Sequence, residues 1–349
     1  MILKRKIRNL NLYVTEIGMG TAPLGGWPLA VTEHQAILTL ESAWSNGIRY
    51  FDTAPLYGSG MSEIRLGNFL KNKNRADFVI STKVGRIIVD RKHSLAAEKF
   101  LGSPTNKDSQ FDFSYDGVMR SFEDSLNRLQ LNKIDILHLH DPDNHPDHFE
   151  QAKLGAIKAM IKLKNEGDVS ALGCGMNQNE MLVELAKEGC FDCFLLAGRY
   201  TLLDQTSLEE LIPICEKNNI SLILGGVFNS GILINPSSES FFDYTKLDSE
   251  WFVNLKNSLV RIPKEHESAD YWLNKAYNLK DACSAFNTTL KRAAIQFPYF
   301  NNIISSCLLG MNNPNQVKDN INDYYKKLPD NFWKYLQESK LIDLRSPIN

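Results

Sequence analysis

Short runs of apolar residues alternate along this chain with longer segments in which apolar positions recur every three or four residues. The first pattern is typical of buried β-strands and the second of amphipathic helices. From Ile17 onward we count eight predicted strands, at residues 17–21, 47–50, 78–85, 134–140, 169–173, 193–196, 220–224 and 303–309. Strands that are apolar on both faces and alternate with helices favour a parallel (β/α)8 barrel, the TIM-barrel class of α/β proteins.

Capping residues mark the ends of several predicted helices. Thr32 and Gln35 form a capping box, and Asn46-Gly47 ends the helix that they begin. Further helices are predicted to open at Ser62, to span residues 114–129, and to span residues 148–166 with Gly167 at the end. Ahead of the first barrel strand, two short β-like runs predict an N-terminal hairpin. Since no linker interrupts the pattern, we expect residues 1–349 to form a single domain.

Two spacings are too long for the strand and helix repeat. Residues 86–113 follow the third predicted strand, and residues 232–285, which contain Trp251 and Trp272, follow the seventh. Insertions after barrel strands build substrate pockets in many enzymes, although they can also be surface additions. We therefore expect long loops after strands 3 and 7 that contribute to specificity.

Composition and charge exclude some classes of partner. The chain of 349 residues has a formal net charge of -2 and 43% hydrophobic residues, so neither nucleic acid nor an anionic membrane is an expected partner. No apolar run is long enough to span a bilayer, and the basic start is not followed by a signal core. We expect a cytoplasmic protein that acts on a small molecule, and a homo-oligomer remains open.

Six cysteines in a chain of this length do not suggest a disulfide framework. Cys190 and Cys193 have a C-x-x-C spacing, but no second such pair completes a zinc site. We expect these cysteines to be ordinary packing residues.

Four polar side chains stand where predicted strands end. Asp52 and Tyr57 follow the second strand, Lys83 closes the third, and His140 closes the fourth. A phenol transfers protons poorly at neutral pH, since its reference pKa is about 10. The ammonium of Lys83, held by Asp52, would lower the pKa of Tyr57, and His140 could bind the reacting oxygen. None of these groups accepts a hydride, so a redox reaction requires a nicotinamide cofactor.

In order and context, Asp52, Tyr57, Lys83 and His140 resemble the catalytic tetrad of the aldo-keto reductases. The resemblance implies a barrel with a hairpin at its lower end and a dinucleotide across the carboxyl rim, rather than a Rossmann site, for which no G-x-G-x-x-G motif exists here. It assigns cofactor contacts to Gly20, Thr21, Asn177, Tyr200, Gly310, Met311, Asn312, Gln316 and Asn320.

The chain departs from the family pattern at two places in the implied cofactor site. Gly175-Met176 stand where the family usually has Ser-Asn, so Asn177 is the candidate for holding the nicotinamide amide. NADP-dependent members generally place Arg or Lys near the 2′-phosphate, whereas residues 312–320 offer Gln316 and only Lys318 as a cation. Neutral side chains pair poorly with a phosphate. We therefore expect NAD to be preferred over NADP.

Within the superfamily, the closest likeness is to the L-fucose, D-threo-aldose and L-galactose dehydrogenases and pyridoxal 4-dehydrogenase. It rests on four segments, residues 53–58, 137–143, 195–204 and 225–231. The likeness implies oxidation of a cyclic hemiacetal to a lactone, with Tyr57 as the base. Pyridoxal 4-dehydrogenase and a general aldehyde or ketone reductase are the alternatives within the family.

Two further classes of function compete with this hypothesis. His138-x-His140 puts two imidazoles on one face of a strand, as in metal-dependent hydrolases, and the loop 141–148 is rich in His and Asp. The later strands supply no further His, so we expect His138 to be a buried residue below His140 and the loop to be solvated. A non-catalytic subunit on a reductase scaffold is the other alternative, and the intact tetrad argues against it.

Overall fold

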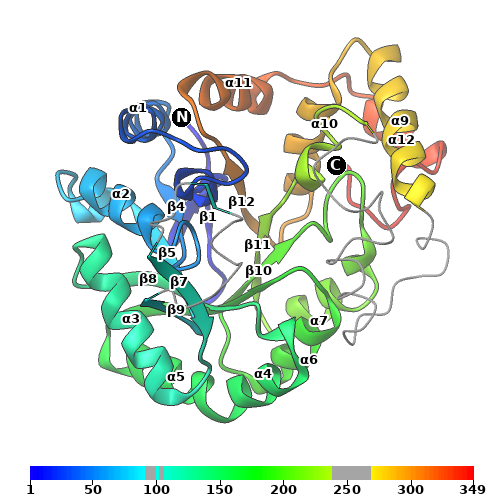
Figure 1. Cartoon of the computed structure of the whole chain (residues 1–349). Helices are drawn as coiled ribbons and strands as arrows, with labels where there is room; N and C mark the ends of the chain where they lie inside the picture. Colours follow the sequence, from blue (N-terminus) through cyan, green and yellow to red (C-terminus); the bar gives the residue numbers. More distant parts are fainter. Residues whose placement is uncertain (91–99, 102–105, 238–268) are drawn as a thin grey trace.

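The computed structural model describes residues 1–90, 100–101, 106–237 and 269–349. Eight parallel strands close into a barrel in the order β10-β11-β12-β3-β4-β5-β8-β9. Their bounds are β3 Ile17–Gly20, β4 Tyr50–Asp52, β5 Val79–Val84, β8 Ile134–His140, β9 Val169–Met176, β10 Cys193–Ala197, β11 Ser221–Gly225 and β12 Ile304–Gly310. The predicted (β/α)8 barrel is confirmed. Helices surround it, as Figure 1 shows.

The four predicted helical segments are present among the helices of the described residues, and a π-helix at Ala152–Ala156 interrupts the last of them. The α-helices of the described residues are α1 Glu33–Ser45, α2 Met61–Leu70, α3 Tyr115–Leu129, α4 Pro146–Gln151, α5 Ile157–Glu166, α6 Glu180–Leu185, α7 Leu211–Lys217, α9 Ala269–Ala285, α10 Leu290–Gln296, α11 Pro314–Tyr325 and α12 Phe332–Glu338. The hydroxyl of Thr32 accepts the N–H of Gln35 at the start of α1, because a helix leaves its first N–H groups without intrahelical partners. Gly167 ends α5 with φ 87°.

Apolar side chains form two layers of core. Inside the barrel lies a small cluster that includes Tyr50, Ile136, Leu195 and Ile223, and a much larger cluster fills the space between the barrel and the helices. Burial of one such aliphatic side chain contributes about 1.5–3 kcal/mol. The two layers hold the strand ends in fixed positions, and the polar groups at those ends depend on that rigidity.

The N-terminal hairpin closes the lower end of the barrel. Strands β1 (Lys4–Lys6) and β2 (Tyr13–Thr15) pair antiparallel, as predicted. The guanidinium of Arg5 donates to Glu16 and to the carbonyls of Tyr299, Asn301 and Ile304. Since these partners come from both ends of the sequence, Arg5 ties the hairpin to the last part of the barrel.

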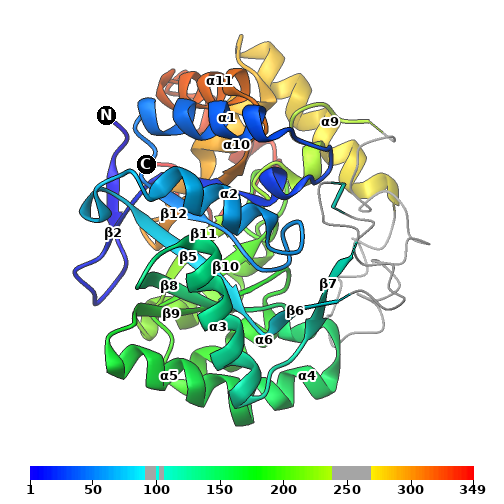
Figure 2. The same cartoon turned by 60° about the vertical axis from the view of Figure 1, so that its left-hand side comes forward.

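Three expectations about local structure need correction. Residues 86–113 are not a simple loop, because β6 (Arg86–Asp90) pairs antiparallel with β7 (Lys107–Phe111), which Figure 2 shows beside the barrel. The segment 141–148 is not a plain solvated loop, because it forms a 3-10 turn and the start of α4. Residues 47–49 lie outside strand β4, which begins at Tyr50. Trp251 and much of the insertion after β11 lie outside the described residues.

Candidate active site

Strand ends bring the four predicted catalytic residues together. Asp52 ends β4, Lys83 is the last residue but one of β5, and His140 ends β8. Tyr57 lies on the loop between β4 and α2. Carboxyl ends of parallel strands meet at one rim of a barrel, so residues up to 88 positions apart in the sequence become neighbours.

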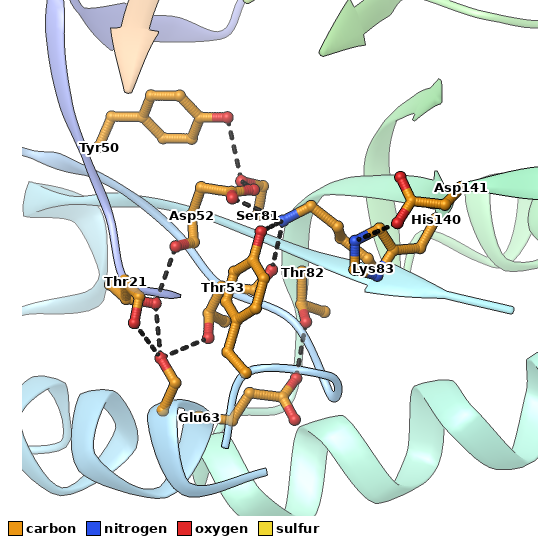
Figure 3. A network of polar contacts seen from close by, with 12 residues as sticks. Thr21, Tyr50, Asp52, Thr53, Glu63, Ser81, Thr82, Lys83, His140 and Asp141 are labelled. Atoms are coloured by element: carbon orange, nitrogen blue, oxygen red, sulfur yellow. Dashed lines mark hydrogen bonds and ion pairs between the residues drawn. The ribbon is translucent and has the colours of Figure 1, made fainter. Parts of the chain in front are cut away.

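Lys83 is the centre of the cluster. Its ammonium group donates to Asp52 Oδ2 at 2.6 Å, to the carbonyl of Thr53 at 2.9 Å and to Tyr57 Oη at 3.1 Å, and part of this network is drawn in Figure 3. A lysine ammonium has three hydrogens to donate, so these partners use all of them. The side chain of Lys83 is only 2% exposed. The phenol oxygen of Tyr57 is therefore held against a buried, fully hydrogen-bonded cation.

A second line of hydrogen bonds holds Asp52 from below. Ser81 Oγ donates to Asp52 Oδ1 at 2.7 Å, and Ser81 Oγ lies 3.0 Å from the phenol oxygen of Tyr50. With Lys83 on Oδ2, both carboxylate oxygens of Asp52 are engaged. Sequence reasoning missed Ser81 and Tyr50. The available signal was a hydroxyl side chain two positions before Lys83 and two positions before Asp52, because residues two apart lie on the same face of a strand.

His140 lies beside Tyr57, with the two ring centroids 6.0 Å apart in an edge-on arrangement. Burial lowers the pKa of His140 well below its usual value of about 6.5, and the positive charges of Lys83 and Arg86 lower it further. His140 is therefore a neutral imidazole at physiological pH, and it can hydrogen-bond a reacting oxygen without adding a charge.

The expected low pKa of Tyr57 is not found in the ligand-free site. Burial raises the pKa of Tyr57 above 10, and the ammonium of Lys83 offsets this rise only in part. Burial would lower the pKa of Lys83, but the charges and hydrogen bonds of Asp52 and Tyr57 raise it instead. The resting site thus holds a neutral phenol beside an ammonium, which suits an acid better than a base.

Backbone contact between two loops fixes the position of Tyr57. A Cβ atom on Gly25 would lie 2.6 Å from the carbonyl carbon of Tyr57, and one on Gly58 would lie 2.6 Å from the carbonyl oxygen of Gly25. Gly58 also has φ 66°, a conformation that side chains other than glycine's disfavour. Only glycine at both positions lets the two loops touch in this way.

The half of the rim opposite the polar cluster is made of small residues. His140 pairs with Gly175, Ala197 with Gly225, and Gly310 with Gly20, which in turn pairs with Asp52. A Cβ atom on Gly20 or Gly175 would meet its nearest neighbour at 3.6 Å, an ordinary contact distance. Packing does not require glycine at Gly20 and Gly175, whereas a Cβ atom on Gly225 or Gly310 would lie 3.3 or 3.2 Å from its nearest neighbour. Small residues on this half of the rim are compatible with a flat ring such as nicotinamide beside Asp52 and His140.

The predicted cofactor residues divide into two groups by exposure. Gly20, Asn177, Asn312 and Gln316 are at least partly exposed, and Gly310 is exposed. The carbonyl of Asn177 accepts from Arg199 Nε at 2.8 Å, which fixes its backbone. Thr21, Tyr200, Met311 and Asn320 are almost completely buried. The ring of Tyr200 packs on Phe297, with the two ring centroids 5.5 Å apart.

Helix α11 begins beside the rim. Asn313 caps its first turn by accepting the N–H of Gln316, and Gln316 Oε1 accepts the N–H of Asn312. Lys318 is exposed on the same helix. The side chain of Gln316 is thus already used in the turn that precedes the helix.

The metal hypotheses find no support among the residues that the structure describes. No group of three or more His, Cys, Asp or Glu side chains there could hold a metal ion. His138 is completely buried below His140, and a Cβ atom on Gly173 would lie 2.2 Å from its Nδ1. The six cysteines are all free. In the described part of the chain, no helix is long and apolar enough to cross a membrane.

Comparison with known proteins agrees with the geometry of this site. Residues 16–340 match the aldo/keto reductase family. The chain belongs to this family. Its members are NAD(P)-dependent oxidoreductases, so the protein is an enzyme of that class.

Among curated relatives, the pyridoxal 4-dehydrogenase of Microbacterium luteolum is 37% identical over 97% of this chain and 98% of its own. The D-threo-aldose 1-dehydrogenase of a Pseudomonas species is 34% identical over 95% of both chains. The L-galactose dehydrogenase of Arabidopsis thaliana is 28% identical over 91% of this chain and 86% of its own.

Solved structures support the fold. An aldo-keto reductase of Bacillus halodurans in its holo form superposes with a TM-score of 0.70 at 22% identity, covering 97% of this chain and 96% of that chain. The glycerol dehydrogenase of Gluconobacter oxydans gives a TM-score of 0.72 at 20% identity, over 99% and 97% of the two chains. At this level of identity the likeness concerns the barrel alone.

Proposed function

We propose that this enzyme oxidises the anomeric carbon of an aldose to a lactone with NAD. The observation that carries the proposal is the phenol of Tyr57 at 3.1 Å from the buried ammonium of Lys83, on the rim where the barrel opens. The relatives named for D-threo-aldose and L-galactose support a sugar substrate. Tyr57, Lys83, Asp52 and His140 are the residues to which we assign the chemistry.

In the proposed reaction, the phenolate of Tyr57 removes the proton of the anomeric hydroxyl, and neutral His140 donates a hydrogen bond to the same oxygen. As the C1–O bond becomes a carbonyl, the electron pair of the C1–H bond leaves as hydride. A bound nicotinamide cofactor would supply the hydride acceptor, and Gly20, Asn177 and Gln316 are among the residues to which we assign its binding. Lactone, reduced cofactor and one proton are the products. Lys83 stabilises the phenolate and keeps its oxygen in place, and Asp52 holds the ammonium of Lys83 in position.

Preference for NAD over NADP follows from the start of α11. A 2′-phosphate requires cationic partners, and residues 312–320 contain Lys318 as their only cation. Gln316 is neutral and its amide oxygen is bonded to Asn312. We infer that the site accepts the uncharged ribose of NAD more readily.

A second candidate is oxidation of pyridoxal, which the relative at 37% identity favours. Pyridoxal forms an internal hemiacetal, so its oxidation follows the same steps at a carbon of the same type. Reduction of simple aldehydes or ketones would use Tyr57 in its protonated form.

A substrate panel tests the proposal. Aldoses of both D- and L-series, pyridoxal and simple alcohols are each supplied with NAD or NADP, and NADH or NADPH formation is followed by absorbance. We expect the highest kcat/KM for an aldose with NAD, and a lactone as the product in mass spectrometry. Turnover of pyridoxal alone would select the second candidate, and turnover of simple alcohols alone would refute both.

A further inference from the structure

Tyr50 places a phenol in the apolar interior of the barrel. It stands two positions before Asp52 on β4 and is completely buried, and its ring packs in the cluster that includes Ile136 and Leu195. Gly18 makes room for the ring, because a Cβ atom there would lie 2.8 Å from Tyr50 Cδ1. A phenylalanine ring would fill the same space. The hydroxyl group is therefore the part of Tyr50 that packing does not explain.

This hydroxyl begins a chain of hydrogen bonds that leads to the active site, as Figure 3 shows. The phenol oxygen of Tyr50 lies 3.0 Å from Ser81 Oγ, and Ser81 Oγ donates to Asp52 Oδ1 at 2.7 Å. A serine hydroxyl has one proton to donate, and Ser81 gives it to Asp52. Ser81 therefore accepts from Tyr50, and both O–H groups point toward Asp52. Burial raises the pKa of Tyr50 well above 10, so the phenol keeps its proton throughout an assay.

Asp52 carries its negative charge where burial opposes it. Burial raises the pKa of Asp52, and Lys83 and Ser81 both lower it. Strand β3, on one side of Asp52, pairs with it through Gly20 and has no titratable side chain. The titratable groups that face Asp52 from the other elements are Lys83, Tyr57 and Tyr50, with neutral His138 and His140 beside Lys83.

Ionisation of Tyr57 changes what Asp52 requires. The ammonium of Lys83 donates to both Asp52 and Tyr57, so in the phenolate state it is shared between two anions. The donor on the other oxygen of Asp52 is Ser81, which then has to carry more of the carboxylate charge. Two aligned O–H dipoles with their positive ends toward the site stabilise the added negative charge, and burial makes this effect stronger.

We propose that Ser81, aligned by Tyr50, is a positioning residue of the active site, which holds the carboxylate of Asp52 against Lys83 and favours negative charge on Tyr57. This inference rests on the proposed function, in which the phenolate of Tyr57 is the base. Ser81 and Tyr50 are both completely buried, so they act through Asp52 and not by contact with a substrate.

The first test titrates Asp52 directly and needs neither substrate nor cofactor. Carbon-13 NMR follows protein labelled at the aspartate carboxyl carbon from about pH 4 to pH 8, and the signal of Asp52 is identified by its loss in Asp52→Asn. Ser81→Ala removes the donor to Oδ1, so Asp52 should stay protonated to a higher pH. Its midpoint should rise by about one pH unit or more, the range of a hydrogen bond to a charged group. Tyr50→Phe keeps Ser81 and should give a smaller rise.

Ser306→Ala is the matched control. Ser306 is completely buried on β12, and its hydroxyl donates to the carbonyls of Thr15 and Glu16. The variant therefore loses a buried serine hydroxyl from a barrel strand without altering the chain that leads to Asp52. It should leave the midpoint of Asp52 unchanged. An equal rise in Ser81→Ala and Ser306→Ala, or no rise in Ser81→Ala, would overturn the inference.

The second test measures the pH profile of oxidation for the substrate with the highest kcat/KM in the panel. Tyr57 should ionise at a higher pH in Ser81→Ala, so kcat/KM at neutral pH should fall by about 3- to 10-fold, and the loss should become smaller as the pH rises. A purely structural defect would lower the rate by the same factor at every pH, and that result would overturn the inference.

Failure of this inference differs from failure of the proposed function. If substrates are oxidised but neither the midpoint of Asp52 nor the pH profile moves in Ser81→Ala, the inference alone is overturned. If no substrate of the panel is oxidised, the proposed function fails, and the NMR titration of Asp52 still tests the inference. A rise in Ser81→Ala that is larger than in Tyr50→Phe, with none in Ser306→Ala, would support it.

Discussion

Replacement of Lys83 by Met should move the pH dependence of oxidation upward. Two unit charges 3.1 Å apart, the distance from Lys83 Nζ to Tyr57 Oη, interact by about 5 kcal/mol at an effective dielectric constant of about 20. In Lys83→Met the buried carboxylate of Asp52, which lies 2.6 Å from the ammonium in the unaltered enzyme, should take up a proton because it loses its cation. Its repulsion of the phenolate is then lost as well, which offsets about half of the roughly 5 kcal/mol, so about 2–3 kcal/mol remains. That energy corresponds to about two pKa units of Tyr57.

Oxidation requires the phenolate, so its rate rises with pH until the phenol has ionised. Without the ammonium, the midpoint should rise by about two units, and kcat/KM at neutral pH should fall by about 10²-fold. The assay is the initial rate of NADH formation from about pH 6 to pH 10.5. Where the midpoint lies above this range, the slope of the logarithm of the rate against pH shows the part of the profile below it. An unchanged pH profile in Lys83→Met would refute the role of Lys83 in lowering the pKa of Tyr57. His140 would then be the candidate for activating Tyr57.

Loss of one partner also leaves Asp52 buried without its cation, which can destabilise the fold. The double variant Asp52→Asn/Lys83→Met removes the whole ion pair and serves as the control. It should show the same upward shift, because Tyr57 loses its cation in both variants. Thermal unfolding of each variant separates a folding defect from a change in the chemistry.

Three other predictions test the base, the cofactor and the hairpin. Tyr57→Phe should lower turnover by about 10²-fold or more. The Kd for NADH, measured by fluorescence titration, should stay within about 3-fold of that of the unaltered enzyme. Near-normal turnover would contradict the assignment of Tyr57 as the base. Gln316→Arg should lower the ratio of kcat/KM for NAD to that for NADP, because the arginine supplies a partner for the 2′-phosphate. If the unaltered enzyme prefers NADP, the argument for NAD from residues 312–320 is refuted. Arg5→Met should lower the free energy of unfolding by about 3 kcal/mol, since the buried carboxylate of Glu16 loses its cation and keeps the hydroxyl of Tyr324 as a donor. Urea denaturation measures this change, and the pH profile of activity should stay unchanged.

The barrel and the meeting of Asp52, Tyr57, Lys83 and His140 at one rim could be predicted because both follow from local patterns. Each of Asp52, Lys83 and His140 ends an apolar run, and the polarity of a parallel barrel then places all three at one rim. Nothing in the predicted pattern needed knowledge of distant contacts. The predicted start of the second strand at Gly47 is wrong, because Gly47, with φ 91°, lies in the turn after α1 and the strand begins at Tyr50.

Features that depend on tertiary contacts could not be predicted in this way. Strand β7 contains Lys, Asp, Ser and Gln, so its composition resembles a loop, and only its pairing with β6 makes the two segments a sheet. The raised pKa of Tyr57 follows from burial, which the sequence does not report. Burial of Tyr200 against Phe297 likewise joins segments nearly 100 residues apart.

Contact between Gly25 and Gly58 has a consequence for how this active site can diverge. Neither glycine touches a reacting atom, yet a methyl group on either would displace the loop that carries Tyr57. Substitution of either glycine can therefore inactivate the enzyme, although neither residue has a side chain that takes part in the chemistry. These two positions therefore restrict every descendant that retains Tyr57 in its present place.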